Sequence, residues 1–361
     1  MTPVPSTDHT IQRPFGRRAL LAAGIGIATS PLIASCQAPA PNRFEAVDGV
    51  IRGLDGKTFT PLGANVGTFK TFDWKGDARG HAADAVEWGW NTIRLNVMVT
   101  DAAKWSYVEM YGQPALVDLV SEIVDEYTAA GLVVILDAHD NPRTQGYDQG
   151  AMEEAITTWW RAAATRFRDN PRVWCGLINE PNYANAEWVR IIDTLATAVR
   201  DTGNANPILV AAPCWGQDVG YQQPYFTDTK FSYEPDMAPT ISKRHGNVIL
   251  EQHNYGAFGM YSSADKLAGY VAKVRDAGLT PLIGEFGYTI DRSSTSGNFN
   301  ANYDGAQAVF ETTRPLEVGA LWWHGTHGDN YSLKASGAAF WDGGAGNGLS
   351  EAGTKLWSLA H

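Results

Sequence analysis

The chain has 361 residues, a formal net charge of −11 and only three cysteines. With 44% hydrophobic and 19% charged residues, its composition is globular, which excludes a disordered, collagen-like or coiled-coil chain. The acidic balance argues against nucleic acid as a partner, because phosphates require a basic face. The high tryptophan and tyrosine content fits either a large aromatic core or an aromatic-lined groove for a flat ligand such as a sugar ring.

Residues 1–36 are interpreted as an export signal. Three arginines precede an uncharged run over 19–34 that is too short and too interrupted to span a bilayer. Arg17-Arg18 is similar to a twin-arginine signal, and Ile33-Ala34-Ser35-Cys36 resembles the lipobox of bacterial lipoproteins, in which the cysteine carries the lipid. We therefore expect export to the periplasm or cell surface with a lipid anchor at Cys36. The alternative is an ordinary cleaved signal and a secreted protein.

Residues 37–46 contain two prolines and predict a tether, and residues 47–361 predict one catalytic domain. The domain is expected to begin with a small β-hairpin, because Asp55-Gly56 lies between the short runs 50–52 and 57–59. Such a hairpin could close the bottom of a barrel.

Eight short apolar runs follow, and amphipathic stretches separate them. The runs are Leu62–Val66, Thr92–Val97, Leu132–Ala138, Val173–Ile178, Ile208–Ala212, Val248–His253, Thr280–Gly284 and Val318–Trp323. Helices are predicted over Leu116–Ala130, Glu153–Phe167, Ala186–Asp201, Ser263–Ala277 and Ala306–Thr313, whereas 217–246 is expected to be loop. Eight alternating units imply an α/β fold, a single (β/α)8 TIM barrel. An open doubly wound sheet is disfavoured, because no Gly-rich phosphate loop follows the first strand.

Polar residues gather where the predicted strands end, which is where such barrels carry active sites. They are Arg94, Asp137, His139, Asp140, Asn179, Glu180, Glu251, His253, Tyr255, Glu285 and Trp323. Burying a carboxylate is unfavourable unless it is paired with a cation or serves a function, so the fold alone does not explain these residues. Two glutamates across a barrel mouth suit glycoside hydrolysis, and their separation decides between retention and inversion. Glu251 lies on the same strand face as His253 and Tyr255, and we expect it to have a supporting role rather than a catalytic one.

Seven segments, in this order along the chain, resemble glycoside hydrolase family 5, the cellulase family within the clan of (β/α)8 retaining glycosidases. They are Leu62-Gly63-Ala64-Asn65, Asn91-Thr92-Ile93-Arg94-Leu95, Asp137-Ala138-His139, Ile178-Asn179-Glu180-Pro181, His253-Asn254-Tyr255, Ile283-Gly284-Glu285-Phe286-Gly287 and Leu321-Trp322-Trp323. The resemblance covers roughly residues 47–361.

The resemblance implies a retaining double displacement in which Glu180 is the general acid/base and Glu285 the nucleophile. It also implies supporting roles for five further residues and a sugar platform. Arg94 and Tyr255 would steady Glu285, Asn179 would bind the sugar 2-hydroxyl, His253 would tune Glu180 or the leaving group, and His139 would lie near the −1 subsite with Trp323 stacking beneath it. The alternatives are structural: a salt bridge for Arg94, satisfied core histidines, and packing for Tyr255 and Trp323.

The substrate class implied by the family is a β-linked plant-type polysaccharide. The segment 212–218 resembles bacterial β-mannanases, which makes Trp215 the first candidate for a subsite platform. The chain departs from those enzymes at Asp137 and at Trp323-His324-Gly325. We expect an endo-β-1,4-mannanase; the alternatives are an endo-β-1,4-glucanase and a non-catalytic sugar-binding lipoprotein on a barrel scaffold. Weaker groove candidates are Trp105, Tyr111, Tyr225, His324 and His327.

No cofactor and no metal ion are expected. Asp137, His139 and His253 could be ligands, but a zinc-dependent barrel hydrolase would usually show His-x-His on the first strand, where this chain has Ala64-Asn65-Val66. Cys175 and Cys214 are expected to be free thiols, because their strand positions place them roughly 15 Å apart. The expected partners are a polysaccharide and, through the lipid anchor alone, a membrane; we expect a monomer.

Overall fold

The computed structural model describes residues 42–67, 78–99, 108–140, 149–181, 183, 185–218, 234–256, 261–289, 299–326 and 331–361. Residues 40–361 form one compact unit. Cys36, Trp105, Tyr225 and His327 lie outside the described residues. No helix in the described ranges is long and apolar enough to cross a membrane.

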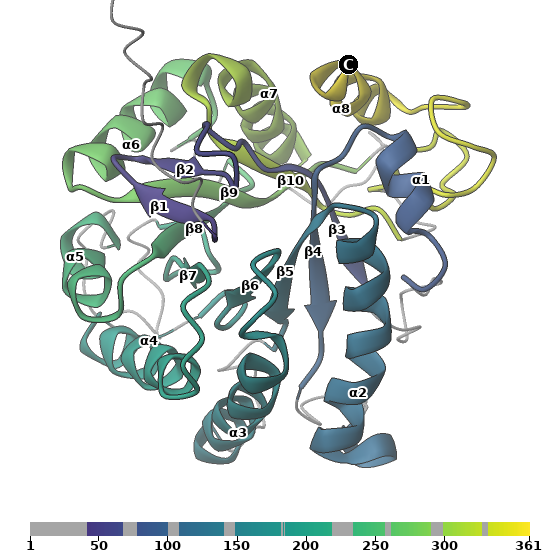
Figure 1. Cartoon of the computed structure of the whole chain (residues 1–361). Coiled ribbons are helices and arrows are strands. Elements are labelled where there is room, and N and C mark those ends of the chain that lie inside the picture. The colour runs from purple at the N-terminus through teal and green to yellow at the C-terminus, as the bar shows by residue number, and fades with distance from the viewer. Residues whose placement is uncertain are drawn as a thin grey trace, which may run out of the picture. The chain divides into compact units, whose positions relative to one another are not determined.

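Eight parallel strands close into a barrel in the order β10-β3-β4-β5-β6-β7-β8-β9 (Figure 1). They are β3 (Leu62–Gly67), β4 (Thr92–Val97), β5 (Val133–Ala138), β6 (Val173–Gly176), β7 (Ile208–Ala211), β8 (Val248–Asn254), β9 (Thr280–Phe286) and β10 (Gly319–Trp322). Each corresponds to one of the eight apolar runs, and the predicted (β/α)8 TIM barrel is confirmed. The strands are buried along their whole length, as parallel strands covered on both faces require.

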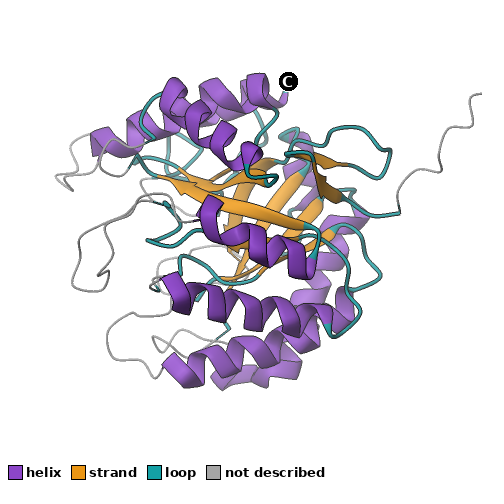
Figure 2. Ribbon diagram, turned by 90° about the vertical axis from the view of Figure 1, so that its left-hand side faces the viewer, coloured by secondary structure: helices purple, strands orange, loops and turns teal. Residues whose placement is uncertain are grey.

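The helices surround the strands (Figure 2). They are α1 (Ala82–Glu87), α2 (Val108–Ala129), α3 (Gln149–Phe167), α4 (Asn185–Arg200), α5 (Glu234–His245), α6 (Ala264–Asp276), α7 (Phe299–Leu316) and α8 (Glu351–Ala360). The prediction of loop over 217–246 is wrong for α5. This helix is mostly polar and contains Pro239, so its sequence has little apolar periodicity, although Ala238 and Ile241 are buried.

The lower part of the barrel is filled by one layer of inward-facing side chains. The layer consists of Val133, Ile135, Trp174, Leu209, Ile249, Leu282 and Leu321, and Phe44 and Ile51 of the N-terminal hairpin join it. The Phe44 ring lies 4.9 Å from that of Phe59 and 5.2 Å from that of Trp174, both edge to face. The hairpin therefore closes the barrel at the end where the strands begin, as expected.

The hairpin turn itself differs from the prediction. The paired strands are β1 (Glu45–Val47) and β2 (Val50–Arg52), and their turn is Asp48-Gly49 with φ of 52° and 76°. A turn with two positive φ values matches the twist of paired strands and favours this dipeptide. The turn predicted at Asp55-Gly56 is also present, but its pairing is shorter: an isolated antiparallel bridge joins Arg52 and Thr58, and backbone hydrogen bonds run from Gly53 N to Lys57 O and from Phe59 N to Ile51 O.

The expectation for the cysteines is confirmed. Cys175 and Cys214 are buried free thiols. Trp322 points out of the barrel, where its ring contacts those of Phe286 and of Phe310 on α7. Because side chains alternate along a strand, the neighbouring Trp323 is directed to the opposite side, toward the site.

Candidate active site

Arg94 on β4 is the centre of a buried charge network. It is completely buried, and its guanidinium reaches three carboxylates on three other strands. Nη1 donates to Glu285 Oε1 at 2.8 Å, Nη2 lies 3.1 Å from Asp137 Oδ1, and Nε lies 2.6 Å from Glu251 Oε1. Burial lowers the pKa of Arg94, but the charges of Asp137, Glu251 and Glu285 outweigh it and raise the pKa overall. Arg94 is therefore a permanent cation, and it fixes the geometry of all three anions.

Glu285 faces the barrel interior because β9 contains a bulge. On β8, Gln252 pairs with Ile283 and the next residue, His253, pairs with Glu285, so the register skips Gly284. Leu282 points into the lower core layer, and Phe286 packs outward against Phe310. Strict alternation from Leu282 would have placed Glu285 outside, and the extra residue turns it toward Arg94.

The Glu285 carboxylate contacts three side chains. Arg94 holds Oε1, the Tyr255 hydroxyl donates to Oε2 at 3.0 Å, and His253 Nδ1 lies 3.4 Å from Oε2. Burial raises the pKa of Glu285, the charges of His253 and Arg94 oppose this, and the charge of Glu180 adds to the rise. Arg94 and Tyr255 thus take the positions expected for residues that steady the nucleophile.

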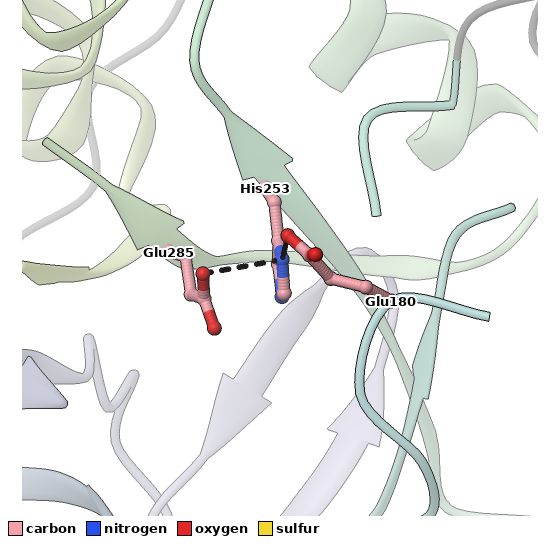
Figure 3. A group of neighbouring side chains, drawn as sticks. All are labelled: Glu180, His253 and Glu285. Carbon is pink, nitrogen blue, oxygen red and sulfur yellow. Dashed lines mark hydrogen bonds and ion pairs between the residues drawn. The ribbon is translucent and has the colours of Figure 1, made fainter. Parts of the chain in front are cut away.

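Glu180 lies four residues beyond the end of β6, in a bend with φ of +42°. A positive φ is unfavourable for a residue with a side chain and is often found at functional sites. The Glu180 side chain is 20% exposed, and its Oε1 lies 3.0 Å from His253 Nδ1 (Figure 3).

The two glutamates are close enough for a double displacement, in which one of them attacks the sugar itself. One oxygen of Glu180, one oxygen of Glu285 and a nitrogen of His253 all lie within 4.8 Å of one another. Carboxylates about 5–5.5 Å apart belong to retaining glycosidases, whereas inverting enzymes leave about 6.5–9.5 Å for a water molecule. The geometry therefore fits retention.

His253 lies between the two glutamates and is held there by the loop after β7. Its backbone N–H donates to Gly216 O at 2.7 Å. Gly216 has φ of +71°, and a Cβ on it would lie 2.5 Å from His253 Cγ, so the imidazole needs glycine at this position. Burial lowers the pKa of His253, but the charge of Glu285, the hydrogen bond with Glu180 and the Glu251 carboxylate 3.6 Å from Nε2 raise it to about 10.

His139 and Trp323 form a second pair beside Arg94. Their rings stack at a centroid distance of 5.2 Å and an angle of 10°. His139 Nδ1 lies 2.7 Å from Asp137 Oδ2, and burial, which raises the pKa of Asp137, is outweighed by the charges of Arg94 and His139. Asp137 thus joins the pair to the Arg94 network.

Asn179 is tied to the same network. Its Oδ1 accepts from Arg94 Nη2 at 3.0 Å, so the Nδ2 donor is the atom with which it can bind a hydroxyl. The predicted site residues Arg94, His139, Asn179, Glu180, His253, Tyr255, Glu285 and Trp323 are therefore brought together.

Among the described residues, those proposed for the outer part of the groove are not part of this cluster. Trp215 lies on the loop after β7 and is half-buried, with its side chain packed against the main hydrophobic core. His324 is only 3% exposed, so it offers almost no surface to a groove. Tyr111 lies within α2, and its side chain is not among those described.

The site contains one group with the spacing of a metal centre, within the described residues. It is the same Glu180, His253 and Glu285 cluster. A metal requires a neutral imidazole lone pair, whereas His253 faces carboxylates and its pKa is raised to about 10. The cluster thus has its own cation in His253, which fits acid–base and nucleophilic chemistry better than metal binding.

Asn65 on β3 is a site residue that the sequence reasoning did not single out. Its Nδ2 donates to Gly284 O at 2.9 Å, and its Oδ1 accepts from Arg94 Nη1 at 2.9 Å and from Asn96 Nδ2 at 3.1 Å. It therefore links the strand of the nucleophile to the arginine. The signal that could have found it was a polar residue within a buried strand.

A family model described as cellulase (glycosyl hydrolase family 5) matches residues 54–329. The mannan endo-1,4-beta-mannosidase of Streptomyces lividans is 26% identical over 311 residues, which are 83% of this chain and 72% of that protein. The beta-mannanase/endoglucanase A of Caldicellulosiruptor saccharolyticus is 28% identical over 251 residues, which are 67% of this chain but only 16% of that protein.

A solved structure agrees with these similarities. The catalytic domain of a mannanase from Streptomyces sp. SirexAA-E superposes with a TM-score of 0.66 at 25% identity, over 89% of this chain and 90% of that chain. The sequence match and the structural match therefore cover the same barrel.

Proposed function

Because the chain belongs to glycosyl hydrolase family 5, the cellulase family, and is a glycoside hydrolase, we propose that it is a retaining endo-β-1,4-glycanase that prefers β-mannan. The observation that carries the mechanism is the pair Glu180 and Glu285, with one oxygen of each within 4.8 Å of the other. Arg94, Tyr255 and His253 surround the Glu285 carboxylate and favour its ionised form.

In the first step the Glu285 carboxylate attacks the anomeric carbon. The glycosidic carbon–oxygen bond breaks, its electron pair leaves with the leaving-group oxygen, and that oxygen takes the proton of Glu180. The product of this step is a glycosyl ester on Glu285 and an ionised Glu180.

In the second step Glu180 removes a proton from water, and the water oxygen bonds to the anomeric carbon. The ester bond breaks, and its electron pair returns to Glu285, so both glutamates recover their starting states. Asn179, held by Arg94, is placed to bind the sugar 2-hydroxyl, and Trp323 offers a flat ring beneath the sugar.

The preference for mannan has two supports. The loop after β7, with Trp215, resembles the corresponding segment of bacterial β-mannanases, and two relatives carry names that include mannan cleavage. One of those names also includes endoglucanase, which keeps β-1,4-glucan as the second candidate substrate.

The test is release of reducing ends from β-mannan, glucomannan and carboxymethylcellulose. We expect mannan to be cleaved fastest, with Glu180→Ala and Glu285→Ala inactive on it. Asp125→Asn is the matched control, because it removes an exposed carboxylate that pairs with Arg166 between α2 and α3. Cleavage of cellulose alone would contradict the mannan preference, and no cleavage by folded wild type would favour the sugar-binding alternative.

The two glutamates are distinguished by an aryl glycoside whose leaving group needs no proton. Glu180→Ala should still form the glycosyl-enzyme from it, whereas Glu285→Ala should not. Proton NMR of the first product should show the β-anomer. An α-anomer as the first product would contradict the retaining mechanism.

We further propose that the protein is exported and held at the membrane by a lipid on Cys36, and that the catalytic barrel acts as a monomer. The twin-arginine-like and lipobox-like segments of residues 1–36 support the anchor. Labelling with a radioactive fatty acid should mark the wild type and not Cys36→Ser. Light scattering should give the mass of one chain for the barrel, and a dimer mass would contradict the monomer.

A further inference from the structure

Glu251 is a third buried glutamate, and it touches both positive groups around the nucleophile. Its Oε1 lies 2.6 Å from Arg94 Nε and 3.6 Å from His253 Nε2, and the residue is 1% exposed. The backbone makes room for it, because a Cβ on Gly284 would lie 1.9 Å from the same oxygen. The double displacement requires only two glutamates, so the third needs a separate explanation.

The position of Glu251 decides the protonation of His253. His253 Nδ1 faces Glu180 Oε1 at 3.0 Å and Glu285 Oε2 at 3.4 Å, and Nε2 faces Glu251. A neutral imidazole has one N–H and one lone pair, and an ionised carboxylate can only accept. A neutral His253 would therefore direct a lone pair at an ionised carboxylate, either from Nε2 at Glu251 or from Nδ1 at Glu285. Only the imidazolium, with a proton on each nitrogen, suits both sides.

We propose that Glu251 is a positioning residue that keeps His253 an imidazolium throughout the catalytic cycle, so that His253 is the constant counter-charge of both catalytic glutamates. Glu251 acts through His253 and Arg94 and does not touch the substrate. The inference rests on the proposed function for its kinetic consequences, but the protonation of His253 can be measured without any substrate.

A constant cation is useful here because the negative charge moves during the reaction. When Glu285 forms its ester and Glu180 gives up its proton, one negative charge disappears from Glu285 and one appears on Glu180. In the second step the charge returns. His253 Nδ1 lies 3.0 Å from one carboxylate and 3.4 Å from the other, so the imidazolium stabilises the charge in both locations without rearrangement.

The other groups around His253 do not change charge in the neutral to alkaline range in which it is expected to titrate. Arg94 is a permanent cation, and burial together with the neighbouring carboxylates raises the pKa of Tyr255 well above its ordinary value. Burial raises the pKa of Cys214, on the loop after β7, to about 12. With an aryl glycoside whose leaving group needs no proton, the first step does not require the proton of Glu180, so the loss of activity on the alkaline side is expected to follow His253.

The first experiment is a histidine NMR titration of the wild-type protein. With ring-labelled histidine, and with the His253 signal assigned by its loss in His253→Asn, both ring nitrogens should carry protons up to about pH 9, in keeping with a pKa of about 10. Titration of His253 near 6.5, the ordinary value, would overturn the proposal without any need for a variant.

The second experiment is the same titration in Glu251→Gln, which has the same shape but no charge. The new side-chain amide can donate to a lone pair on Nε2, so neutral His253 becomes acceptable, and its pKa should fall by about 1–3 units. The matched control is Asp193→Asn, which removes the carboxylate 2.8 Å from His245 Nε2 at the other end of β8. It should change the His245 signal and leave His253 unchanged.

Kinetics separates positioning from a merely structural role. With the aryl glycoside whose leaving group needs no proton, the alkaline limb of kcat/KM in Glu251→Gln should move down by the same number of pH units as the His253 titration, so activity at pH 9 should fall more than at pH 6. An equal loss at every pH, or an unchanged His253 titration, would overturn the proposal. If no glycan is cleaved by the wild type, the proposed function fails, and the NMR titration still decides the protonation of His253.

Discussion

Gly284→Ala is the substitution for which the structure makes the sharpest prediction. Gly284 precedes the nucleophile in the bulge of β9, and a Cβ there would lie 1.9 Å from Glu251 Oε1 and 2.5 Å from the Cγ and Cδ atoms of the same side chain. Real contacts of this kind are at least about 3 Å, so the carboxylate must move by about 1 Å or more. It cannot do so without leaving Arg94 Nε, which it meets at 2.6 Å.

The expected loss of stability has two parts. Overpacking of a well-filled site costs about 1–3 kcal/mol. Disruption of the buried ion pair between Glu251 and Arg94 costs about 1.5–3 kcal/mol, the range for a polar contact with a charged group. Together they predict a free energy of unfolding lower by about 3–6 kcal/mol and a melting temperature lower by roughly 5–15 °C. Displacement of Arg94 should also lower kcat/KM by about 100-fold, because a shift of about 1 Å in a catalytic group has effects of that size.

The assay is thermal and chemical unfolding of Gly284→Ala beside Gly269→Ala. Gly269 lies within α6, and a Cβ added there would meet no atom within 4 Å, so alanine should stabilise the helix by about 0.5–1 kcal/mol. The double variant Glu251→Ala with Gly284→Ala should lose less than the sum of the two single variants, because the clash is gone. Wild-type melting of Gly284→Ala, or full additivity in the double variant, would refute the reasoning.

Three further predictions concern the site and the barrel. Tyr255→Phe removes the hydroxyl that donates to Glu285 Oε2 at 3.0 Å, and it should lower kcat/KM about 10- to 150-fold. Burial already raises the pKa of Glu285, and loss of this donor should raise it further. Because the nucleophile must be ionised, the acid limb of the pH profile should move to higher pH. An unchanged acid limb in the pH profile would contradict this. Phe44→Ala should lower the free energy of unfolding by about 3–5 kcal/mol in denaturant titration while leaving kcat/KM at 25 °C unchanged, because Phe44 packs at the opposite end of the barrel. Lost activity at unchanged stability would count against that placement. Asn65→Ala should lower the free energy of unfolding by about 1–3 kcal/mol for each buried group left without a partner, because Asn65 binds Gly284 O and Arg94. It should also lower kcat/KM. Calorimetry and kinetics on one preparation check both effects.

Much of the barrel could be predicted because its determinants are local. A fully buried parallel strand needs a short apolar run, and each of the eight runs is visible without any knowledge of its neighbours. The exceptions are elements whose local signal is weak or duplicated. α5 is mostly polar and contains Pro239, so it lacks an apolar stripe. The chain offers two Asp-Gly turns, and Asp48-Gly49 forms the main hairpin because Phe44 and Ile51 beside it fill the bottom of the barrel.

The sequence by itself determined the fold class and the chemical type of the site, because strand periodicity and the residues at strand ends are properties of short segments. The tertiary structure alone decided how those residues act. Only the bulge at Gly284 turns Glu285 inward, and only barrel closure brings Asp137, Glu251 and Glu285 from three strands onto the single guanidinium of Arg94. The charge of a buried group depends on every neighbour within a few ångströms, and those neighbours are far apart in the chain.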